Sequence, residues 1–396
     1  MRRISADYIF PISSEPIKNG IITIDDDGTI LDISNADPML PKQDVEYYEG
    51  IICPGFINTH CHLELSHLRS QIPENIGMTE FIKAVISKRL EFTDHQIQQA
   101  ILDAEAEMIK NGIVAVGDIS NNNSTFKQKE KGNLLYHTFI EIFNLDPDKS
   151  EDAFNKGILL QQEFSQISSK VSIVPHAPYT VSEKLLKLIH ENAVESNSIL
   201  SIHNQESKTE NELFISKSGL MYETFKAMGI NTDFMRHTGH NSLRSTLPFL
   251  DKAAKLLLVH NTFTDQDDIK FAEKRMGNEQ LSNLFWCTCP NANMFIENSL
   301  PDYNCFLNEN VRITIGTDSL ASNWSLSVLD ELKTITKHYP NIPLQTLLLW
   351  ATKNGAEFLG FQQLGTIEKG KKPGLNLLKN IDALRISEET VVFKLA

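Results

Sequence analysis

Histidines and carboxylates stand at points where short strand-like stretches of this sequence end. His60 and His62 follow the stretch Phe56–Thr59, and His203 follows Ile199–Ile202. Neutral imidazole nitrogens and carboxylate oxygens are common protein ligands of divalent metals. His60 and His62 are two positions apart, a spacing that points both rings to one side of an extended chain. Although an H-x-H pair also occurs by chance, this pattern indicates metal-assisted chemistry.

Further polar groups end other apolar stretches. Glu206 lies three residues after His203. His260 ends a leucine- and valine-rich run, and Asp318 follows an apolar run and a glycine. Each has an ordinary explanation, because a histidine after a strand is often a satisfied core residue and an aspartate there often caps a helix, with Ser319 as a rival cap. Packing alone does not require so many such groups at strand ends, so we expect one metal site.

The elements that must position these residues alternate in a βα pattern through the middle of the chain. We expect strands at Phe56–His60, Val114–Ile119, Leu134–Phe143, Val171–Pro175, Ile199–His203, Leu256–His260, Leu284–Thr288 and Arg312–Thr317. We expect helices at Asp94–Lys110, Ser182–Glu195, Asp265–Arg275, Ser327–His338 and Pro343–Leu359. Eight βα units predict an α/β fold of the TIM (β/α)8 barrel class, whose functional residues gather at the C-terminal strand ends. A doubly wound sheet competes, but no Gly-rich phosphate turn follows the first strand.

Both ends of the chain have a different, β-rich texture. Near the N-terminus, Ile21–Ile24 and Thr29–Ile33 flank a tight turn, which indicates a hairpin. Near the C-terminus, the segments Gly365–Gly370, Leu375–Leu378 and Thr390–Phe393 have the same β-rich pattern, and we expect strands there. We therefore predict a composite β-sandwich domain from residues 1–53 and 363–396. The barrel would occupy residues 54–362.

The length, charge and cysteine content of the chain limit which partners and which cellular location we expect. The 396 residues suit a barrel with a small accessory domain, and 37 basic against 51 acidic side chains give a formal net charge of −14. This acidity works against binding of nucleic acid phosphates or anionic membranes, so we expect neither partner. The five cysteines are too few and scattered for a disulfide framework. Since no apolar run reaches about 18 residues and no signal peptide is evident, we expect a cytoplasmic protein.

These motifs, taken in order, resemble those of a known superfamily. Pro54–His62, the pair His203 and Glu206, His260, and Gly316–Asp318 resemble the strand-end motifs of the amidohydrolase superfamily. Within it, they are similar to the aminohydrolase branch of cytosine, guanine and S-adenosylhomocysteine deaminases and triazine chlorohydrolases. The tail Leu364–Lys371 resembles the segment that returns to the sandwich, although Pro373-Gly374 stands where the family usually has Ala-Asp.

The resemblance implies a role for each matching residue. It implies that one divalent metal, zinc with iron as the alternative, is held by His60, His62, His203 and Asp318. Glu206 would be the proton shuttle, His260 would polarise the attacked centre, and Asp318 would also accept a proton. The fourth predicted strand does not end in lysine, where dinuclear members carry a carboxylated lysine, and this favours a single metal.

Narrower features concern the substrate. His62–Ser66, Pro175–Thr180 and Cys289–Asn293 look like the group of aminodeoxyfutalosine deaminases. Glu80 falls where related nucleoside deaminases place a glutamate that contacts ribose, although Phe81 replaces their usual tryptophan. His176 and Ser319, at two further strand ends, complete the expected substrate contacts.

The function implied is hydrolytic deamination of an amino-substituted heteroaromatic ring, purine nucleoside-like, with aminodeoxyfutalosine as one candidate. Metal-bound hydroxide would attack the ring carbon and release ammonia. A chlorohydrolase or another C–N hydrolase on the same scaffold is the alternative. A catalytically silent binding module is a third reading, against which the complete ligand set argues. Because many barrels of this kind dimerise, a homodimer is also an expectation.

Overall fold

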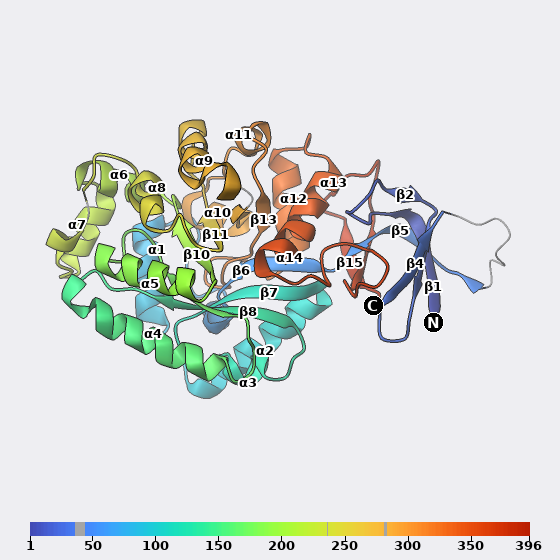
Figure 1. Cartoon of the computed structure of the whole chain (residues 1–396), viewed down its shortest axis with the longest axis horizontal. Coiled ribbons are helices and arrows are strands. Elements are labelled where there is room, and N and C mark those ends of the chain that lie inside the picture. Colours follow the sequence, from blue (N-terminus) through green and yellow to red (C-terminus); the bar gives the residue numbers. More distant parts are fainter. Residues whose placement is uncertain (36–43, 236, 281–282) are drawn as a thin grey trace.

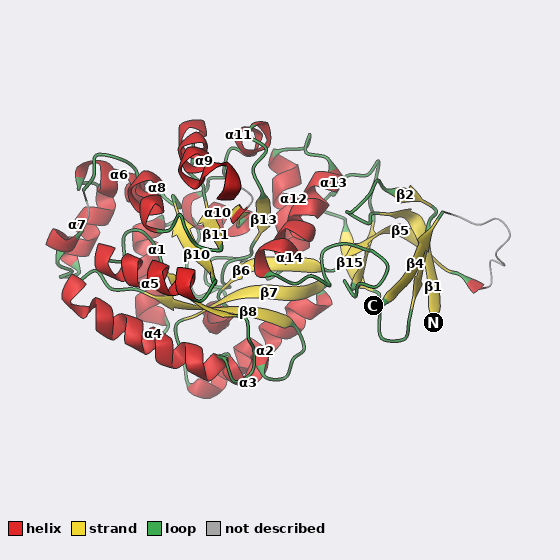
Figure 2. Ribbon diagram, in the orientation of Figure 1, coloured by secondary structure: helices red, strands yellow, loops and turns green. Residues whose placement is uncertain are grey.

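The computed structural model describes residues 1–35, 44–235, 237–280 and 283–396, with the side chains of 278–280 left out. A larger body of parallel strands covered by helices adjoins a smaller β end that holds both chain termini (Figure 1; Figure 2). Among the described residues, no helix combines the length and the apolar character that a membrane crossing needs.

The parallel strands form two sheets of four strands each. The first sheet contains β6 (Phe56–Cys61), β7 (Ile113–Ser120), β8 (Leu135–Ile142) and β9 (Val171–Pro175). The second contains β10 (Ile199–Asn204), β11 (Lys255–His260), β12 (Leu284–Thr288) and β13 (Ile313–Ile315). Each of the eight predicted strands is thus confirmed in position. The last is shorter than the expected Arg312–Thr317, because the backbone leaves the extended conformation before Asp318.

The two sheets meet at both of their edges. Between β9 and β10, the backbone N–H of His203 donates to the carbonyl of His176 at 3.0 Å. Between β13 and β6, the N–H groups of Thr317 and Asp318 both donate to the carbonyl of His60 at 3.0 Å. Strand pairing is therefore not continuous around a ring, and the closed barrel stays a prediction. Both junctions lie next to residues of the predicted metal site.

Helices cover the two parallel sheets. Their bounds are α1 (Met78–Lys88), α2 (Asp94–Lys110), α3 (Phe126–Lys129), α4 (Ser150–Phe164), α5 (Glu183–Glu195), α6 (Lys208–Ser216), α7 (Leu220–Ala227), α8 (Ser242–Thr246), α9 (Gln266–Gln280), α10 (Pro290–Glu297), α11 (Tyr303–Asn308), α12 (Val328–His338), α13 (Leu344–Ala351) and α14 (Lys353–Leu359). The prediction for α2 is confirmed, and Thr93 caps its N-terminus in a capping box. Four short 3₁₀ segments with described bounds lie in the loops: η3 (Pro147–Lys149), η4 (Thr232–Phe234), η5 (Leu247–Phe249) and η2 (Leu63–Leu68), the last of which follows β6.

One helix prediction is wrong. The expected single helix Pro343–Leu359 is two helices, α13 and α14, separated at Thr352 with φ −134° and ψ −83°. The Thr352 hydroxyl donates to the Leu348 carbonyl at 2.6 Å and so offers that backbone group a partner other than the helix ladder. After the break, α14 packs beside β6 and β13.

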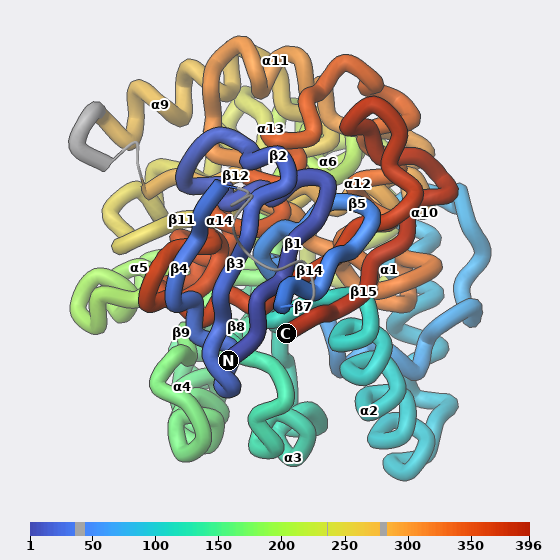
Figure 3. The backbone as a smooth tube through the Cα atoms, turned by 90° about the vertical axis from the view of Figure 1, so that its right-hand side faces the viewer, coloured from blue at the N-terminus to red at the C-terminus, as the bar shows by residue number. Residues whose placement is uncertain are grey.

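Strands from both chain ends pair in one antiparallel-rich sheet of seven strands (Figure 3). They are β1 (Arg2–Ile9), β2 (Ile17–Lys18), β3 (Ile21–Ile24), β4 (Ile30–Ser34), β5 (Glu46–Pro54), β14 (Leu375–Lys379) and β15 (Val391–Lys394). The predicted hairpin is β3 and β4, and Leu375 of β14 pairs with Pro54 of β5. Gly365–Gly370 forms no strand. Since all seven strands belong to one sheet, the sandwich arrangement and its boundaries stay predictions.

A separate hydrophobic cluster lies beyond the C-terminal ends of the parallel strands. It joins segments that follow β6, β9, β10 and β12 and contains Leu68, Tyr179, Phe214, Phe225 and Phe295. α1 packs on α7 and α10 beside it. These segments cover the strand ends, and their side chains leave the polar residues there almost fully buried. The interior below is filled by a larger cluster drawn from all eight strands and the helices around them.

Candidate active site

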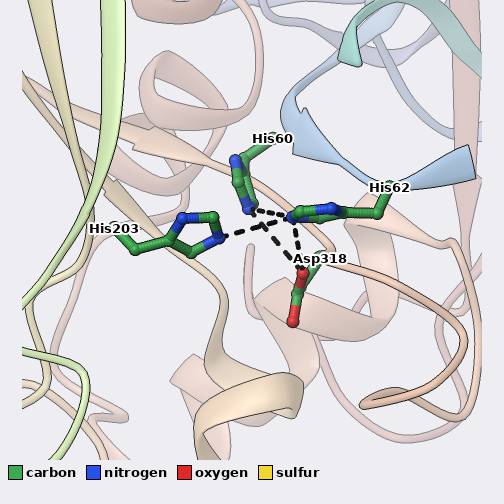
Figure 4. Close-up of side chains that lie close together, drawn as sticks. All are labelled: His60, His62, His203 and Asp318. Carbon is green, nitrogen blue, oxygen red and sulfur yellow. Dashed lines mark hydrogen bonds and ion pairs between the residues drawn. The ribbon is translucent and has the colours of Figure 1, made fainter. Parts of the chain in front are cut away.

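Three histidines and one aspartate converge where the strands end (Figure 4). The Nε2 atom of His62 lies 3.2 Å from Nε2 of His60 and 3.3 Å from Nε2 of His203. Oδ1 of Asp318 lies 3.7 Å from Nε2 of His60 and 3.5 Å from Nε2 of His62. One ligand atom from each residue lies within 4.8 Å of all the others. The sequence prediction that these four residues meet is confirmed in space.

The donor set fits a divalent cation. A tetrahedral ion with metal–nitrogen distances of about 2.1 Å spaces its ligand atoms about 3.4 Å apart, close to the separations of these nitrogens and the carboxylate oxygen. Three imidazole nitrogens and a carboxylate oxygen are thus crowded into one buried space, where the lone pairs of neutral imidazoles repel one another. The exposed fractions of the four residues are at most 6%. A positive ion shared by all four would compensate this arrangement.

Backbone and side-chain partners fix the orientation of His203. Its Nδ1–H donates to the carbonyl oxygen of His176 at 2.7 Å, so Nε2 is left as the lone-pair atom that faces the cluster. The carboxylate of Glu141, at the end of β8, places Oε1 3.6 Å from the same Nδ1. Such outer partners hold the ring and raise its basicity. The sequence analysis missed Glu141, yet a lone carboxylate in the apolar run Leu134–Phe143 was a usable signal.

The position of Asp318 is set by its strained backbone and by a hydrogen bond from a serine hydroxyl. Its φ is +55°, in the left-handed region that non-glycine residues seldom adopt. One carboxylate oxygen accepts a hydrogen bond from Ser322, and the other faces the histidines. Burial would raise the pKa of Asp318, but its hydrogen bond with His60 and the charges of His62 and His260 hold that pKa below its ordinary value. Asp318 is therefore ionised, as a metal ligand must be.

Glu206 and His260 form a second pair beside this cluster. Nε2 of His260 lies 3.4 Å from Oε1 of Glu206. Nδ1 of His260 donates to Oδ1 of Asn293 at 2.9 Å, which leaves Nε2 facing the carboxyl group. Burial lowers the pKa of His260 to about 4 and raises the pKa of Glu206 well above its ordinary value. A carboxyl group whose pKa is raised by burial holds its proton more firmly than an ordinary glutamate and can serve as a proton donor and acceptor.

The turn that presents Glu206 is held by Glu210. The buried Glu210 carboxylate accepts the backbone N–H groups of Gln205 and Glu206, both at 3.0 Å. Gln205 has a φ of +46°, so these bonds stabilise a strained turn. Ser207 caps α6 by accepting the N–H of Glu210. Glu210 was also missed, although a second carboxylate one helical turn after Glu206 was visible in the sequence.

A buried ion pair supports the loop after His62. Oδ1 of Asp118 accepts the backbone N–H of Leu63 at 2.8 Å, and Oδ2 lies 2.7 Å from Nζ of Lys129. Both side chains are at most 2% exposed. The pair therefore fixes the direction in which the chain leaves the H-x-H segment. The sequence analysis gave it no role.

The three predicted substrate contacts have different surroundings. The ring of His176 has its centroid 4.8 Å from that of His203, and its Nδ1 is bonded to the Thr180 hydroxyl at 2.8 Å. Ser319 is buried next to Asp318, and its hydroxyl accepts the N–H of Ala321 in a turn, whereas the helix that follows, α12, is capped by Ser327. The Glu80 side chain is 54% exposed and pairs with Lys83 at 2.7 Å. His176 and Ser319 adjoin the cluster, Glu80 does not, and the substrate roles of all three stay predictions.

The family of the chain follows from comparison with known proteins. Residues 51–395 match the model of the amidohydrolase family. The chain therefore belongs to the amidohydrolase family, and it is a hydrolase. The resemblance inferred from the strand-end motifs is confirmed.

Curated relatives are similar along most of their length. An adenosine deaminase of Helicobacter pylori is 27% identical over 348 residues, covering 85% of this chain and 81% of that protein. A 5-methylthioadenosine/S-adenosylhomocysteine deaminase of Dictyoglomus turgidum is 26% identical over 355 residues, with 85% and 75% covered. An aminodeoxyfutalosine deaminase of Nitratiruptor is 24% identical over 371 residues, with 87% and 83% covered.

Solved structures share the fold. The aminofutalosine deaminase of Helicobacter pylori in complex with methylthio-coformycin superposes with a TM-score of 0.80 at 24% identity, covering 96% of this chain and 93% of that one. A zinc-bound adenosine deaminase of Xanthomonas campestris gives 0.71 at 19% identity, with 98% and 86% covered. An atrazine chlorohydrolase of Arthrobacter aurescens complexed with zinc gives 0.72 at 16%, with 97% and 88% covered.

Proposed function

We propose that this protein is a metal-dependent deaminase that hydrolyses the exocyclic amine of a purine nucleoside-like substrate. The observation that carries the proposal is the Glu206–His260 pair beside the cluster of His60, His62, His203 and Asp318. The names of the curated relatives support deamination, since three of them act on adenine-containing compounds.

Each residue has a distinct task in this reaction. A divalent ion, zinc with iron as the alternative, would be held by His60, His62, His203 and Asp318 and would supply Lewis acidity that lowers the pKa of water toward neutrality. Glu206, whose pKa is raised by burial, protonates a ring nitrogen, then takes up a proton from the added water and passes it to the departing amine. His260 is proposed to polarise the attacked centre from its place beside Glu206. Asp318, ionised and held by Ser322, accepts a proton from the attacking water.

His176 is proposed as a substrate contact because its ring adjoins His203 at the same strand ends. Glu80 and Ser319 complete the proposed set. The substrate class extends to aminodeoxyfutalosine, which the motifs His62–Ser66 and Pro175–Thr180 favour. A (β/α)8 barrel over residues 54–362 and a composite β-sandwich over residues 1–53 and 363–396 are proposed on the eight parallel strands and on the shared terminal sheet.

Ammonia release tests the proposal. The purified protein is assayed against adenosine, methylthioadenosine, aminodeoxyfutalosine, guanine and cytosine, with chloride release from a chlorotriazine measured in parallel. Glu206→Gln should retain its metal and lose about 10²- to 10⁴-fold in turnover, the contribution of a positioned acid–base group. Glu212→Gln, an exposed change on the nearby helix α6, is the matched control and should keep normal turnover.

Two results would contradict the assignment. Near-normal ammonia release by Glu206→Gln would show that Glu206 is not the proton shuttle. Chloride release without ammonia release would show that the protein is a chlorohydrolase and not a deaminase.

A further inference from the structure

A cavity of about 730 Å³ lies at the opposite ends of the parallel strands from the metal cluster. Lys255 is the first residue of β11, and Arg312 directly precedes β13. His260 is the last residue of β11, so at about 3.3 Å per residue some 16 Å of strand separates it from Lys255. The far wall comes from α14 and from residues 360–371, which lead into the terminal sheet. In Figure 1, α14 lies at the end of the helical body that faces this sheet.

The charge of this cavity contrasts with that of the whole protein. Its wall contains four cationic side chains and two carboxylates. The cations are Lys255, Arg312, Lys353 and Lys371, and the carboxylates are Glu357 and Glu368. The chain as a whole carries a formal net charge of −14. A concave region lined by one sign of charge concentrates the opposite ion, and here the excess charge is positive.

At one end of the cavity, one carboxylate is the ion-pair partner of more than one cation. Glu357 forms an ion pair with Arg312 and lies 3.9 Å from Nζ of Lys353. Lys255 contacts no carboxylate among the described residues, and its ammonium donates to the carbonyls of Glu357 and Phe358. Lys170, which directly precedes β9, places Nζ 5.0 Å from the centre of the Phe361 ring in the same wall. The positive charge here therefore exceeds what the local carboxylates neutralise.

Helix capping explains part of this arrangement. Lysines commonly hydrogen-bond the last carbonyls of a helix, as Lys255 does at the end of α14. Capping does not require Arg312, Lys353 and Lys170 as well. Burial lowers the pKa of Lys255 below its ordinary value, and the charges of Arg312 and Lys170 act in the same direction, against that of Glu357. An anion in the cavity would offset these positive charges.

We propose that this cavity binds a small phosphorylated molecule through its phosphoryl group. Ammonium and guanidinium groups are the side chains that recognise phosphoryl oxygens by charge-assisted hydrogen bonds. The cavity volume falls within the range of about 300–1,000 Å³ that is typical of small-molecule sites. Phe361 and Ala356 give the wall an apolar part, which suits an organic substituent on the phosphate. This site stands apart from the proposed deaminase reaction and does not depend on it.

Titration calorimetry at constant ionic strength tests the proposal, with inorganic phosphate, pyrophosphate and ribose 5-phosphate as probes. We expect saturable binding of pyrophosphate at one site per chain. Lys255→Gln and Lys353→Gln should each weaken it by about tenfold or more, the effect of losing about 1.4 kcal/mol of interaction. Lys255→Arg, which keeps the charge, should bind nearly normally. Ribose 5-phosphate that binds more tightly than pyrophosphate identifies an organic phosphate as the ligand class, and equal binding identifies the free anion.

A matched control separates this site from general charge effects. Lys184→Gln removes an exposed lysine that pairs with Glu151 on the helical surface, away from the cavity. It should leave the affinity unchanged. Because the Lys353 side chain is 40% exposed, its replacement should not disturb folding even if Lys255→Gln does. The proposal is overturned if the wild-type protein shows no saturable binding, or if Lys184→Gln weakens binding as much as Lys353→Gln.

Discussion

Replacing Glu210 should separate the placement of Glu206 from the binding of metal. Glu210 is fully buried and accepts the N–H groups of Gln205 and Glu206 through its two carboxylate oxygens. Glu210→Ala removes both acceptors. Glu210→Gln keeps one oxygen and turns an N–H₂ group toward a backbone donor.

The expected loss of stability follows from these two bonds. A buried donor left without a partner costs about 1–3 kcal/mol, so Glu210→Ala should lose about 2–6 kcal/mol and Glu210→Gln about half of that. The turn can recover part of this loss, because Gln205 has a φ of +46° and relaxation releases strain of about 1–3 kcal/mol. That relaxation moves the backbone of Glu206. A displacement of about 1 Å at a reacting group is enough to cost about 10²-fold in rate.

Three measurements on each variant test this reasoning. Ammonia release gives kcat and KM, elemental analysis gives the metal content, and urea unfolding gives the free energy of unfolding. We expect Glu210→Ala to bind metal normally, because none of the four clustered ligand side chains is bonded to Glu210. We expect kcat to fall about 10²-fold, with an intermediate fall for Glu210→Gln. Glu212→Ala, an exposed change on the same helix, is the control and should change neither kcat nor the free energy of unfolding.

The outcome that would refute the positioning role is specific. If Glu210→Ala lowers the free energy of unfolding but leaves kcat unchanged, then Glu210 stabilises the turn without placing Glu206. If neither quantity changes, the two hydrogen bonds contribute nothing measurable and the argument from buried donors is wrong.

Three further predictions concern the metal and the buried carboxylates. Chelation should lower the thermal midpoint, because a metal present at about 1,000 times its Kd adds about 4 kcal/mol to the native state; an unchanged midpoint in a metal-free sample would contradict the shared site. Glu141→Gln should weaken metal retention about 10- to 100-fold through the orientation of His203, and metal titration measures it, with full retention counting against the contact. Burial raises the pKa of Glu64 from 4.5 to about 8, so the folded state holds an extra proton between those values. Its contribution to stability therefore falls as pH rises through that window, by up to about 1.36 kcal/mol per pH unit, and Glu64→Gln should flatten this part of the urea-unfolding profile; identical profiles would show that Glu64 does not titrate there.

Strand and helix positions were predictable where their signals are local. Val171–Pro175 and Leu284–Thr288 coincide with β9 and β12, and Asp94–Lys110 coincides with α2. An apolar run ended by polar residues, or a capping threonine before an amphipathic stretch, needs no information from distant parts of the chain. The break at Thr352 was missed because its hydroxyl contact competes with a helix pattern that is otherwise continuous.

The supporting residues around the site could not be placed in the same way. Glu141 and Asp118 each occur as one carboxylate in an apolar strand, and the sequence does not say which neighbour each meets. Their partners, His203 and Lys129, belong to other elements. Whether such a carboxylate caps, pairs or orients a ligand depends on the order of strands in the sheet.

By itself, the amino-acid sequence determined which donor atoms exist, the strand ends that carry them, and the membership of this chain in the amidohydrolase family. The tertiary structure alone decided that His60, His62, His203 and Asp318 share one space, and that the carbonyl of His176 leaves Nε2 of His203 facing the others. The reason is physical. Local hydrogen bonds and side-chain periodicity set secondary structure, whereas distances of a few ångströms between remote residues arise only when sheets, helices and their covering loops pack together.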